Sequence, residues 1–111
     1  MDRSQLLKGT TELLILGVLK DGELYGYEIA QRIRDRSGAF IDPGEGWLYP
    51  TLHRLETRGA LQASWRAGRI GPRRRYYKIT EAGLTAFNAQ SAEWAQFARS
   101  VRLVTAGGAD G

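Results

Sequence analysis

The fold is decided by GWLYPTLHRLETRGAL, the stretch Gly46–Leu61. Leu48, Leu52 and Leu55 recur in it at helical spacing, which predicts a helix with one buried face. Pro50 is compatible with this helix if the helix begins near the first residue of the stretch, because amides of a first turn have no intrahelical partner. We expect the leucines to attach the helix to a core and to leave its other side exposed.

The exposed side of this helix has the composition of a surface that contacts DNA. At about 100° per residue, it carries the side chains opposite the leucines and those at its flanks. Reading a DNA groove requires such a mixture of hydrogen-bond donors, apolar surface and positive charge. The expected contacts are Trp47, Tyr49, Pro50, Thr51, His53, Arg54 and Arg58.

Two of these residues have more than one interpretation. Trp47 can contact bases, stack on a sugar, or pack against a neighbouring hairpin. His53 is the only histidine of the chain, and we interpret it as a surface residue or a phosphate donor. The chain contains no cysteine either, so neither a metal site nor a disulfide is expected.

Two helices are predicted before this stretch. The first covers residues 4–20, is capped by Ser4, and is apolar on most sides, so that more than one face is buried. The second covers residues 25–36, where Ile29 and Ile33 face inward at a separation of four residues. Asp-Gly and Ser-Gly pairs end the two helices.

After Gly59, which suits the position behind a helix end, the hydrophobic period changes to two. Residues 61–66 alternate between apolar and polar, which predicts a strand with Trp65 on its buried face. RRRYYKI, residues 73–79, alternates as well, with Tyr77 inward and Tyr76 nearer solvent or DNA. The glycine-containing loop between the two strands predicts a hairpin.

A last long helix begins at Thr80, which can cap it. Its apolar residues recur every three or four positions, with Phe97 and Val104 widening the stripe. A helix of about 20 residues is roughly 30 Å long, which is more than a small core can cover. We therefore expect a homodimer, and the alternative is a helix folded back on its own core. The expected dimer contacts are Leu84, Phe87, Trp94, Ala98 and Val101.

Positive charge is concentrated in one segment. Residues 54–78 contain eight Lys/Arg and one Asp/Glu, a net charge of +7, whereas residues 1–53 and 79–111 have net charges of −2 and −1. Such a basic island predicts contact with a polyanion, although a solvated charged face is the alternative. Arginine binds phosphate with two parallel hydrogen bonds, so the expected contacts of the hairpin are Arg69, Arg73, Arg74 and Arg75, with Tyr76 beside them.

Several classes of protein are disfavoured by what the chain lacks. Its 111 residues fit one domain. It has no apolar run of the roughly 18 residues that a membrane span needs, and its start does not resemble a signal peptide. Paired carboxylates, a phosphate-binding glycine loop and a nucleophile elbow are missing too, so neither an enzyme nor a cofactor is expected. We expect a cytoplasmic protein associated with the nucleoid and not with a membrane.

The order of elements is helix, helix, helix, strand, basic loop, strand, helix. This order predicts a mainly α fold with a two-stranded β wing, the winged helix-turn-helix, in which the third helix enters a DNA major groove. Residues 1–79 are the expected DNA-binding domain, 80–104 the dimerisation helix, and 105–111 a disordered tail. A protein-interaction module with non-specific nucleic-acid binding is the alternative, whereas a pure interaction module would explain the long helix but not the basic island.

A resemblance to a known family adds to this interpretation. The segments LYPTLHRLETRGAL and RRRYYKITEAG, together with YGYEI in the second helix, resemble the PadR family of bacterial transcriptional regulators. The resemblance covers residues 6–103 and implies a dimeric winged-helix repressor that leaves an inverted-repeat operator in double-stranded DNA when a small molecule or stress signal arrives. The single long C-terminal helix is similar to the short-chain branch. Trp47 and the loop sequence IGPRRR depart from the family pattern, so the operator sequence does not carry over.

The resemblance also implies an effector site. In some relatives an aromatic residue at the place of Trp94 lines a pocket between the subunits and stacks on flat, often cationic, molecules. Phe87 and Phe97 are candidates for the same pocket, and a planar aromatic small molecule is the expected effector. The alternative is that Trp94 only packs the dimer interface.

Overall fold

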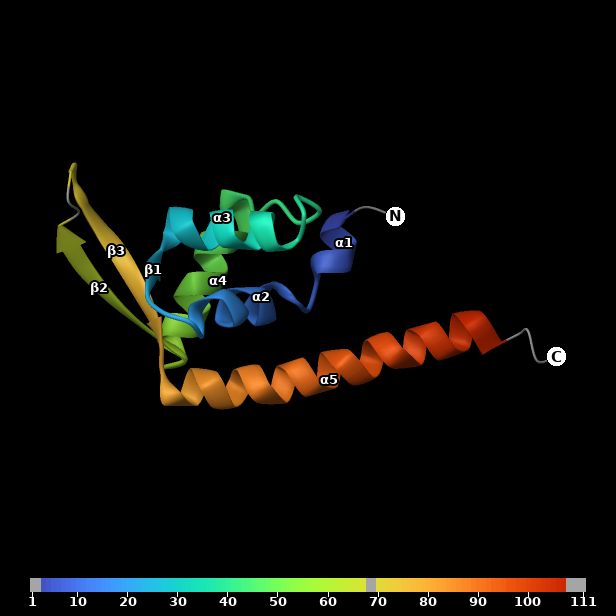
Figure 1. Cartoon of the computed structure of the whole chain (residues 1–111). Helices are drawn as coiled ribbons and strands as arrows, with labels where there is room; N and C mark the ends of the chain where they lie inside the picture. Colours follow the sequence, from blue (N-terminus) through green and yellow to red (C-terminus); the bar gives the residue numbers. More distant parts are fainter. Residues whose placement is uncertain (1–2, 68–69, 108–111) are drawn as a thin grey trace.

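The computed structural model describes residues 3–67 and 70–107. Figure 1 shows a group of short helices, a small sheet at one end of them, and a long helix that runs past them. The molecule is elongated, with principal extents of 62 × 28 × 21 Å. The elements are α1 (Arg3–Leu7), α2 (Thr11–Leu19), β1 (Leu24–Tyr25), α3 (Gly26–Arg36), α4 (Glu45–Thr57), β2 (Leu61–Ala67), β3 (Arg73–Ile79) and α5 (Glu81–Ala106).

The core lies where α2, α3 and α4 meet the base of the sheet. The expected inward residues of α3 and α4 are all buried, which confirms the predicted faces of both helices. Gly59 follows α4 with a φ of +81°, as a glycine after a helix end does. The mainly helical fold with a small β wing is thus confirmed. The buried apolar side chains are Ile15, Leu16, Val18, Leu19, Leu24, Ile29, Ile33, Leu48, Leu52, Leu55, Ala60, Leu61 and Tyr77.

The prediction of one helix over residues 4–20 is wrong. The chain forms α1 and α2 with a break between them, and Ser4 lies inside α1 and not at a cap. Gly9 has a φ of +85°, in the left-handed region that favours glycine and interrupts a right-handed helix. Thr10 closes the turn, because its hydroxyl donates to the carbonyl oxygen of Leu7 at 2.8 Å.

The sheet has three antiparallel strands in the order β1-β3-β2, one more than predicted. The added strand β1 has two residues, too few to show an alternating pattern, and pairs Leu24 with Tyr77. Trp65 was predicted to be buried but is 54% exposed, because the β2–β3 hairpin extends beyond the core. Tyr77 is buried, as predicted.

Pro50 lies deeper in its helix than the sequence suggested. Since α4 begins at Glu45, Pro50 is in the second turn, and the first-turn explanation is wrong. A proline there removes the hydrogen bond that would reach the carbonyl group of Gly46. Both residues are exposed, so water can satisfy that carbonyl group, and the helix continues through the proline.

The start of α5 is attached tightly to the end of α4. The Thr80 hydroxyl accepts a hydrogen bond from the Gly83 amide at 3.1 Å, which confirms the predicted cap, and donates to the Gly59 carbonyl at 2.6 Å. A Cβ at Gly83 would lie 2.2 Å from the carbonyl oxygen of Ala60, so a side chain does not fit there. At its other end α5 continues to Ala106, two residues into the expected tail, whose residues 108–111 lie outside the described part.

Within the described ranges, no helix is both long and apolar enough to cross a membrane.

Candidate nucleic-acid interface and aromatic pocket

The exposed side of α4 carries most of the residues predicted for it. Tyr49, Pro50, His53, Arg54 and Arg58 are all exposed. Their common exposure follows from the helical period, which turns the three leucines of α4 toward the core. This face therefore combines aromatic, apolar and cationic groups in one strip.

One predicted contact on α4, Thr51, is corrected by the structure, and another, Trp47, has an additional packing contact. Thr51 is 1% exposed, and its hydroxyl donates to the Trp47 carbonyl at 2.6 Å, so it supports the helix from inside. Trp47 is partly buried and packs against the hydrophobic core, which none of its three interpretations anticipated.

One carboxylate from α2 pairs with an arginine of α4 and with the arginine that follows its last residue. The Nη2 atom of Arg58 donates to Oε1 of Glu12 at 2.5 Å, and Nε of Arg54 lies 4.0 Å from Oε2 of the same group. The hydrogen bond to Glu12 raises the pKa of Arg58. Arg54 also donates to the Thr51 hydroxyl at 3.1 Å.

The hairpin is attached to the body by two further ion pairs. Arg75 of β3 donates to Glu56 of α4 at 2.6 Å, and Arg66 of β2 donates to Glu23, just before β1. Four of the eight basic residues of the island thus have carboxylate partners, and two of those carboxylates lie outside the island. Within the described residues, Arg73, Arg74 and Lys78 make no ion pair. Arg69 lies outside them.

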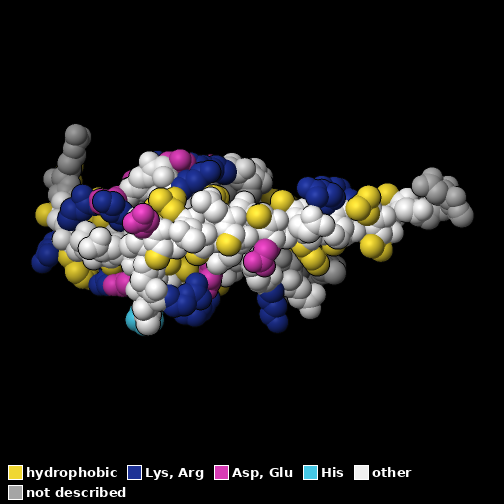
Figure 2. Space-filling view, turned by 90° about the horizontal axis from the view of Figure 1, so that it is seen from below, with side chains coloured by type: hydrophobic (Ala, Val, Ile, Leu, Met, Phe, Trp, Pro, Cys, Tyr) yellow, Lys and Arg dark blue, Asp and Glu magenta, His cyan; other side chains and the backbone are white. Residues whose placement is uncertain are grey.

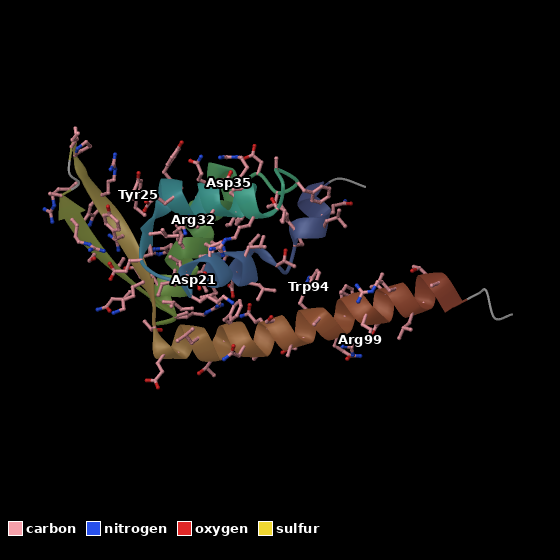
Figure 3. All side chains as sticks on the ribbon, in the orientation of Figure 1. Asp21, Tyr25, Arg32, Asp35, Trp94 and Arg99 are labelled. Carbon is pink, nitrogen blue, oxygen red and sulfur yellow. The ribbon has the colours of Figure 1, made fainter. Side chains whose placement is uncertain are left out.

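Two arginines of the hairpin pack on tyrosine rings that contact each other. The Arg74 guanidinium lies 4.6 Å from the Tyr25 ring centroid, and that of Arg66 lies 4.2 Å from the Tyr76 centroid. The Tyr25 and Tyr76 rings meet edge to face at 5.5 Å. Figure 3 places Tyr25 on the side of the helices that faces the hairpin. Such packing fixes guanidinium groups at an exposed surface.

A cavity of about 400 Å³ joins the hairpin to α4. Its apolar wall depends on Gly26, where a Cβ would lie 2.8 Å from the Tyr49 hydroxyl oxygen, so the glycine lets this ring cross the start of α3. Tyr49 of α4 and the arginines of β3 therefore line one concave surface. Its lining residues are Tyr25, Gly26, Tyr27, Tyr49, Trp65, Arg73, Arg74, Arg75 and Tyr77.

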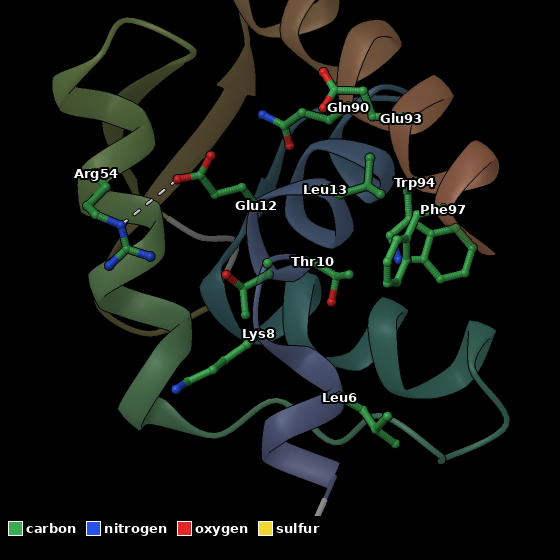
Figure 4. A pocket seen from close by; sticks show the side chains of 12 residues that line it. Leu6, Lys8, Thr10, Glu12, Leu13, Arg54, Gln90, Glu93, Trp94 and Phe97 are labelled. Carbon is green, nitrogen blue, oxygen red and sulfur yellow. Dashed lines mark ion pairs between the residues drawn. The ribbon is translucent and has the colours of Figure 1, made fainter. Parts of the chain in front are cut away.

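A larger cavity of about 600 Å³ separates α5 from α1 and α2. Trp94 and Phe97 lie at one end of it, and Glu12 and Arg54 lie at the other (Figure 4). Phe87, which was expected to share this pocket, does not line it. Its ring packs against the core 5.1 Å from Nζ of Lys20, and lines a separate cavity of about 300 Å³.

The outer part of α5 is uncovered in the single chain. Leu84, Trp94 and Val101 are between 41% and 48% exposed, and Val104 is 80% exposed. Ala98 is only partly buried. Figure 2 shows apolar side chains along the helix, including the part that projects beyond the rest of the molecule. Among the expected dimer contacts, only Phe87 packs against the core of its own chain.

The fold and this interface define a winged-helix DNA-binding protein: three packed helices, a basic hairpin beside the third, and a long helix after it. The comparison of sequences names the family. Residues 15–89 match the transcriptional regulator PadR-like family. The chain belongs to this family, which confirms the resemblance seen in the sequence, and it is a DNA-binding transcriptional regulator.

Individual relatives agree with this assignment. The chain is 36% identical over 94 residues to the transcriptional regulator Rv3488 of Mycobacterium tuberculosis, which covers 85% of this chain and 84% of the relative. A transcriptional regulator from Clostridium thermocellum has a similar structure, with a TM-score of 0.81 and 30% identity over 88% of this chain and 95% of the other. Bacillus subtilis PadR, solved in complex with operator DNA, matches with a TM-score of 0.63 and 26% identity over 70% of this chain and 43% of its own.

The acidic and aromatic partners of the basic residues were not predictable from the sequence. Glu12 and Glu23 lie 46 and 43 positions from the arginines that they hold, and no local pattern indicates such pairs. Tyr25 was seen only as part of a family motif, and its contacts with Arg74 and Tyr76 come from distant parts of the chain.

Proposed function

We propose that the protein is a homodimeric repressor that binds an inverted-repeat operator and is released by a small-molecule or stress signal. The observation that carries the proposal is the concave surface shared by α4 and β3, where Tyr49 lines the same cavity as Arg73 and Arg74. A helix and a basic hairpin in this relation suit a major groove and the backbone beside it.

In this proposal the residues of the surface have different tasks. The exposed part of α4 reads bases, with Arg54 as the principal hydrogen-bond donor and Tyr49, Pro50 and His53 around it. Arg73 and Arg74 bind phosphate, since neither has an ion-pair partner in the described residues. The proposed DNA surface is completed by Arg58, Arg69, Arg75 and Tyr76. Of these, Arg58 is paired with Glu12 and Arg75 with Glu56.

The homodimer is supported by the uncovered apolar side of α5. Burying apolar surface is favourable by roughly 25 cal/mol per Å², and several large side chains of this helix remain exposed in the single chain. Pairing two chains along α5 would bury them. Two α4 helices placed about 34 Å apart would then meet successive turns of one DNA face.

For the effector, the proposed site is the cavity that Trp94 and Phe97 line. Its volume of about 600 Å³ is within the usual range for small-molecule pockets. Figure 3 shows Trp94 projecting from α5 toward α1 and α2, where it presents a flat ring to the cavity. A planar aromatic molecule fits such a wall. Packing against the partner's helix is the competing role of the same residues.

A salt titration of DNA binding, combined with sedimentation, tests the proposed function. Binding through phosphate contacts should weaken steeply between about 50 and 200 mM salt, and the free protein should sediment as a dimer at micromolar concentration. A stable monomer would contradict the dimer. An affinity for nucleic acid that depends on neither sequence nor salt would contradict operator recognition and favour an interaction module.

A further inference from the structure

Glu12 occupies a special position in the charge network of this surface. Among the described residues, Glu12 is the one carboxylate that pairs with two arginines, Arg54 inside α4 and Arg58 at its C-terminal cap. Its side chain is 22% exposed, whereas those of Arg54 and Arg58 are 54% and 52% exposed. The carboxylate thus lies behind the two guanidinium groups, which remain outermost (Figure 4 draws the pair with Arg54).

We infer that Glu12 is a specificity-determining residue, which reduces binding to non-operator DNA by pairing with Arg54 and Arg58. The inference rests on the proposed function, in which α4 faces DNA. Non-specific binding comes almost entirely from neutralising phosphates with cationic groups. A guanidinium that already pairs with a carboxylate gains less from a phosphate, and the carboxylate itself repels the polyanion.

Glu12 also fixes the direction of the side chain that is proposed to read bases. Arg54 contacts the Thr51 hydroxyl on one side, and that hydroxyl is anchored to the Trp47 carbonyl inside the helix. Glu12 limits Arg54 on the other side. A base edge accepts hydrogen bonds only from a guanidinium in the right orientation. Losing Glu12 would therefore leave the Arg54 guanidinium less well oriented toward the operator bases.

The other carboxylates of the surface have a different role. Glu56 and Glu23 each hold a single arginine of the hairpin, and they connect the hairpin to α4 and to the start of β1. Removing either would loosen the hairpin as well as free a charge. Glu12 joins the exposed side of α4 to α2, two helices that the core already packs together. Its removal can therefore change the charge of the surface with little change in the fold.

The test is Glu12→Gln, which keeps the size of the side chain and removes its charge. Affinity would be measured for a duplex of random sequence and for the duplex that the wild-type protein selects most strongly from a random pool. For the random duplex we expect binding about tenfold tighter at low salt, and a slope of log K against log salt that is steeper by about one. The selected duplex should gain less, so the ratio of the two affinities falls severalfold.

Asp21→Asn is the matched control. It removes the same charge and also frees an arginine, because Asp21 pairs with Arg36 at 3.3 Å. Arg36 lines a cavity with Phe87 that includes no residue of α4. This variant should change the affinity for the random duplex by less than about twofold. An equal gain in both variants would reveal an effect of net charge alone and would overturn the inference.

A double-mutant cycle with Arg58→Ala completes the design. If Glu12 acts through this pair, Glu12→Gln should gain much less in the Arg58→Ala background than in the wild-type one. An unchanged gain, or no gain and no steeper slope in the single variant, refutes the role of Glu12. If the wild-type protein binds neither duplex in a salt-dependent way, the proposed function fails first, so the two failures are distinguishable.

Discussion

Individual arginines of the surface differ in what surrounds them, and this difference separates their expected tasks. Arg74 lies over the Tyr25 ring and makes no ion pair in the described residues, whereas Arg54 contacts both Thr51 and Glu12. The first arrangement leaves a full charge for any phosphate. The second orients a donor, as sequence-dependent contacts require.

We therefore predict different losses for two alanine variants. Arg74→Ala should weaken binding to operator and random DNA by about the same factor and flatten the salt dependence by about one unit of slope. Arg54→Ala should cost about 1–3 kcal/mol on the operator and much less on random DNA. Equal losses on both duplexes for both variants, measured by fluorescence anisotropy, would contradict this division.

Trp94 gives a second prediction at this scale. Planar aromatic compounds should quench the tryptophan fluorescence of the wild-type protein, because a stacked ring contacts the indole face. Trp94→Phe should lose most of the quenching, although Trp47 and Trp65 still fluoresce. Trp65→Phe is the control, since its ring lies on the hairpin near Arg75 and not in the cavity of α5. Similar quenching in all three proteins would place the compound elsewhere.

Tyr77 gives a prediction about pH. Burial raises the pKa of its phenol above the ordinary value of 10.0, and the positive charge of Arg75 opposes this rise. The native state therefore holds this proton more tightly than the unfolded state does. The resulting stability should be fully present below pH 10 and should be lost as the pH rises through the native pKa.

Denaturant unfolding at several alkaline pH values measures this effect. The free energy of unfolding should fall less steeply above pH 10 in Tyr77→Phe than in the wild-type protein. Tyr27→Phe is the control, because Tyr27 is exposed. An ultraviolet titration in which Tyr77→Phe removes a phenol of ordinary pKa would contradict the assignment.

The start of α5 packs closely against the residue before β2, and this contact depends on Gly83 inside the helix. The backbone of Gly83 approaches that of Ala60 so closely that a Cβ would meet its carbonyl oxygen at 2.2 Å. Gly17, inside α2, has an ordinary contact instead, with a Cβ placed 3.4 Å from the Phe87 ring. A side chain at position 83 would therefore clash with the backbone, whereas one at position 17 would make an ordinary contact.

We predict that Gly83→Ala destabilises the protein although alanine is the better helix former. Separating α5 from the start of β2 should cost about 1–3 kcal/mol in the free energy of unfolding. Gly17→Ala should be neutral or should stabilise by up to about 1 kcal/mol. Thermal unfolding of both variants provides the measurement, and a more stable Gly83→Ala protein would show that the junction can relax.

The elements also show what the sequence could and could not predict. The faces of α3 and α4, the hairpin and the cap of α5 were predictable, because periodicity and caps are local signals. The break at Gly9 was hidden inside a continuous apolar run. The burial of Thr51 and Trp47, the exposure of Trp65 and the ion pairs of Glu12 depend on which surfaces meet in the folded chain, and no short stretch of sequence encodes that.

The whole molecule consists of a compact body and a helix that extends past it. An extent of 62 Å is more than twice either of the others, and the apolar residues near the end of α5 have no cover in the single chain. A partner along this helix is the proposed explanation.

We predict that Val101→Asp shifts the protein toward the monomer at micromolar concentration, because a charge would replace an apolar group in the proposed interface. Arg99→Asp is the control, since Val101 lies two turns after Trp94 on the same side of the helix, whereas Arg99 lies on a different side from Trp94 (Figure 3). Sedimentation velocity distinguishes the two states. A dimer that tolerates Val101→Asp as well as it tolerates Arg99→Asp would exclude this side of α5 as the interface.

The tight junction between α4 and α5 has a consequence for how the spacing of the two DNA surfaces is controlled. Hydrogen bonds from Thr80 to Gly59 and Ala60 leave no flexible linker between the recognition helix and the long helix. A helix of 26 residues is about 39 Å long, so a tilt of about 5° at one end moves the other by roughly 3 Å. In the proposed dimer, a small change in the crossing angle of the two long helices would therefore alter the distance between the recognition helices enough to lose the match with one turn of DNA.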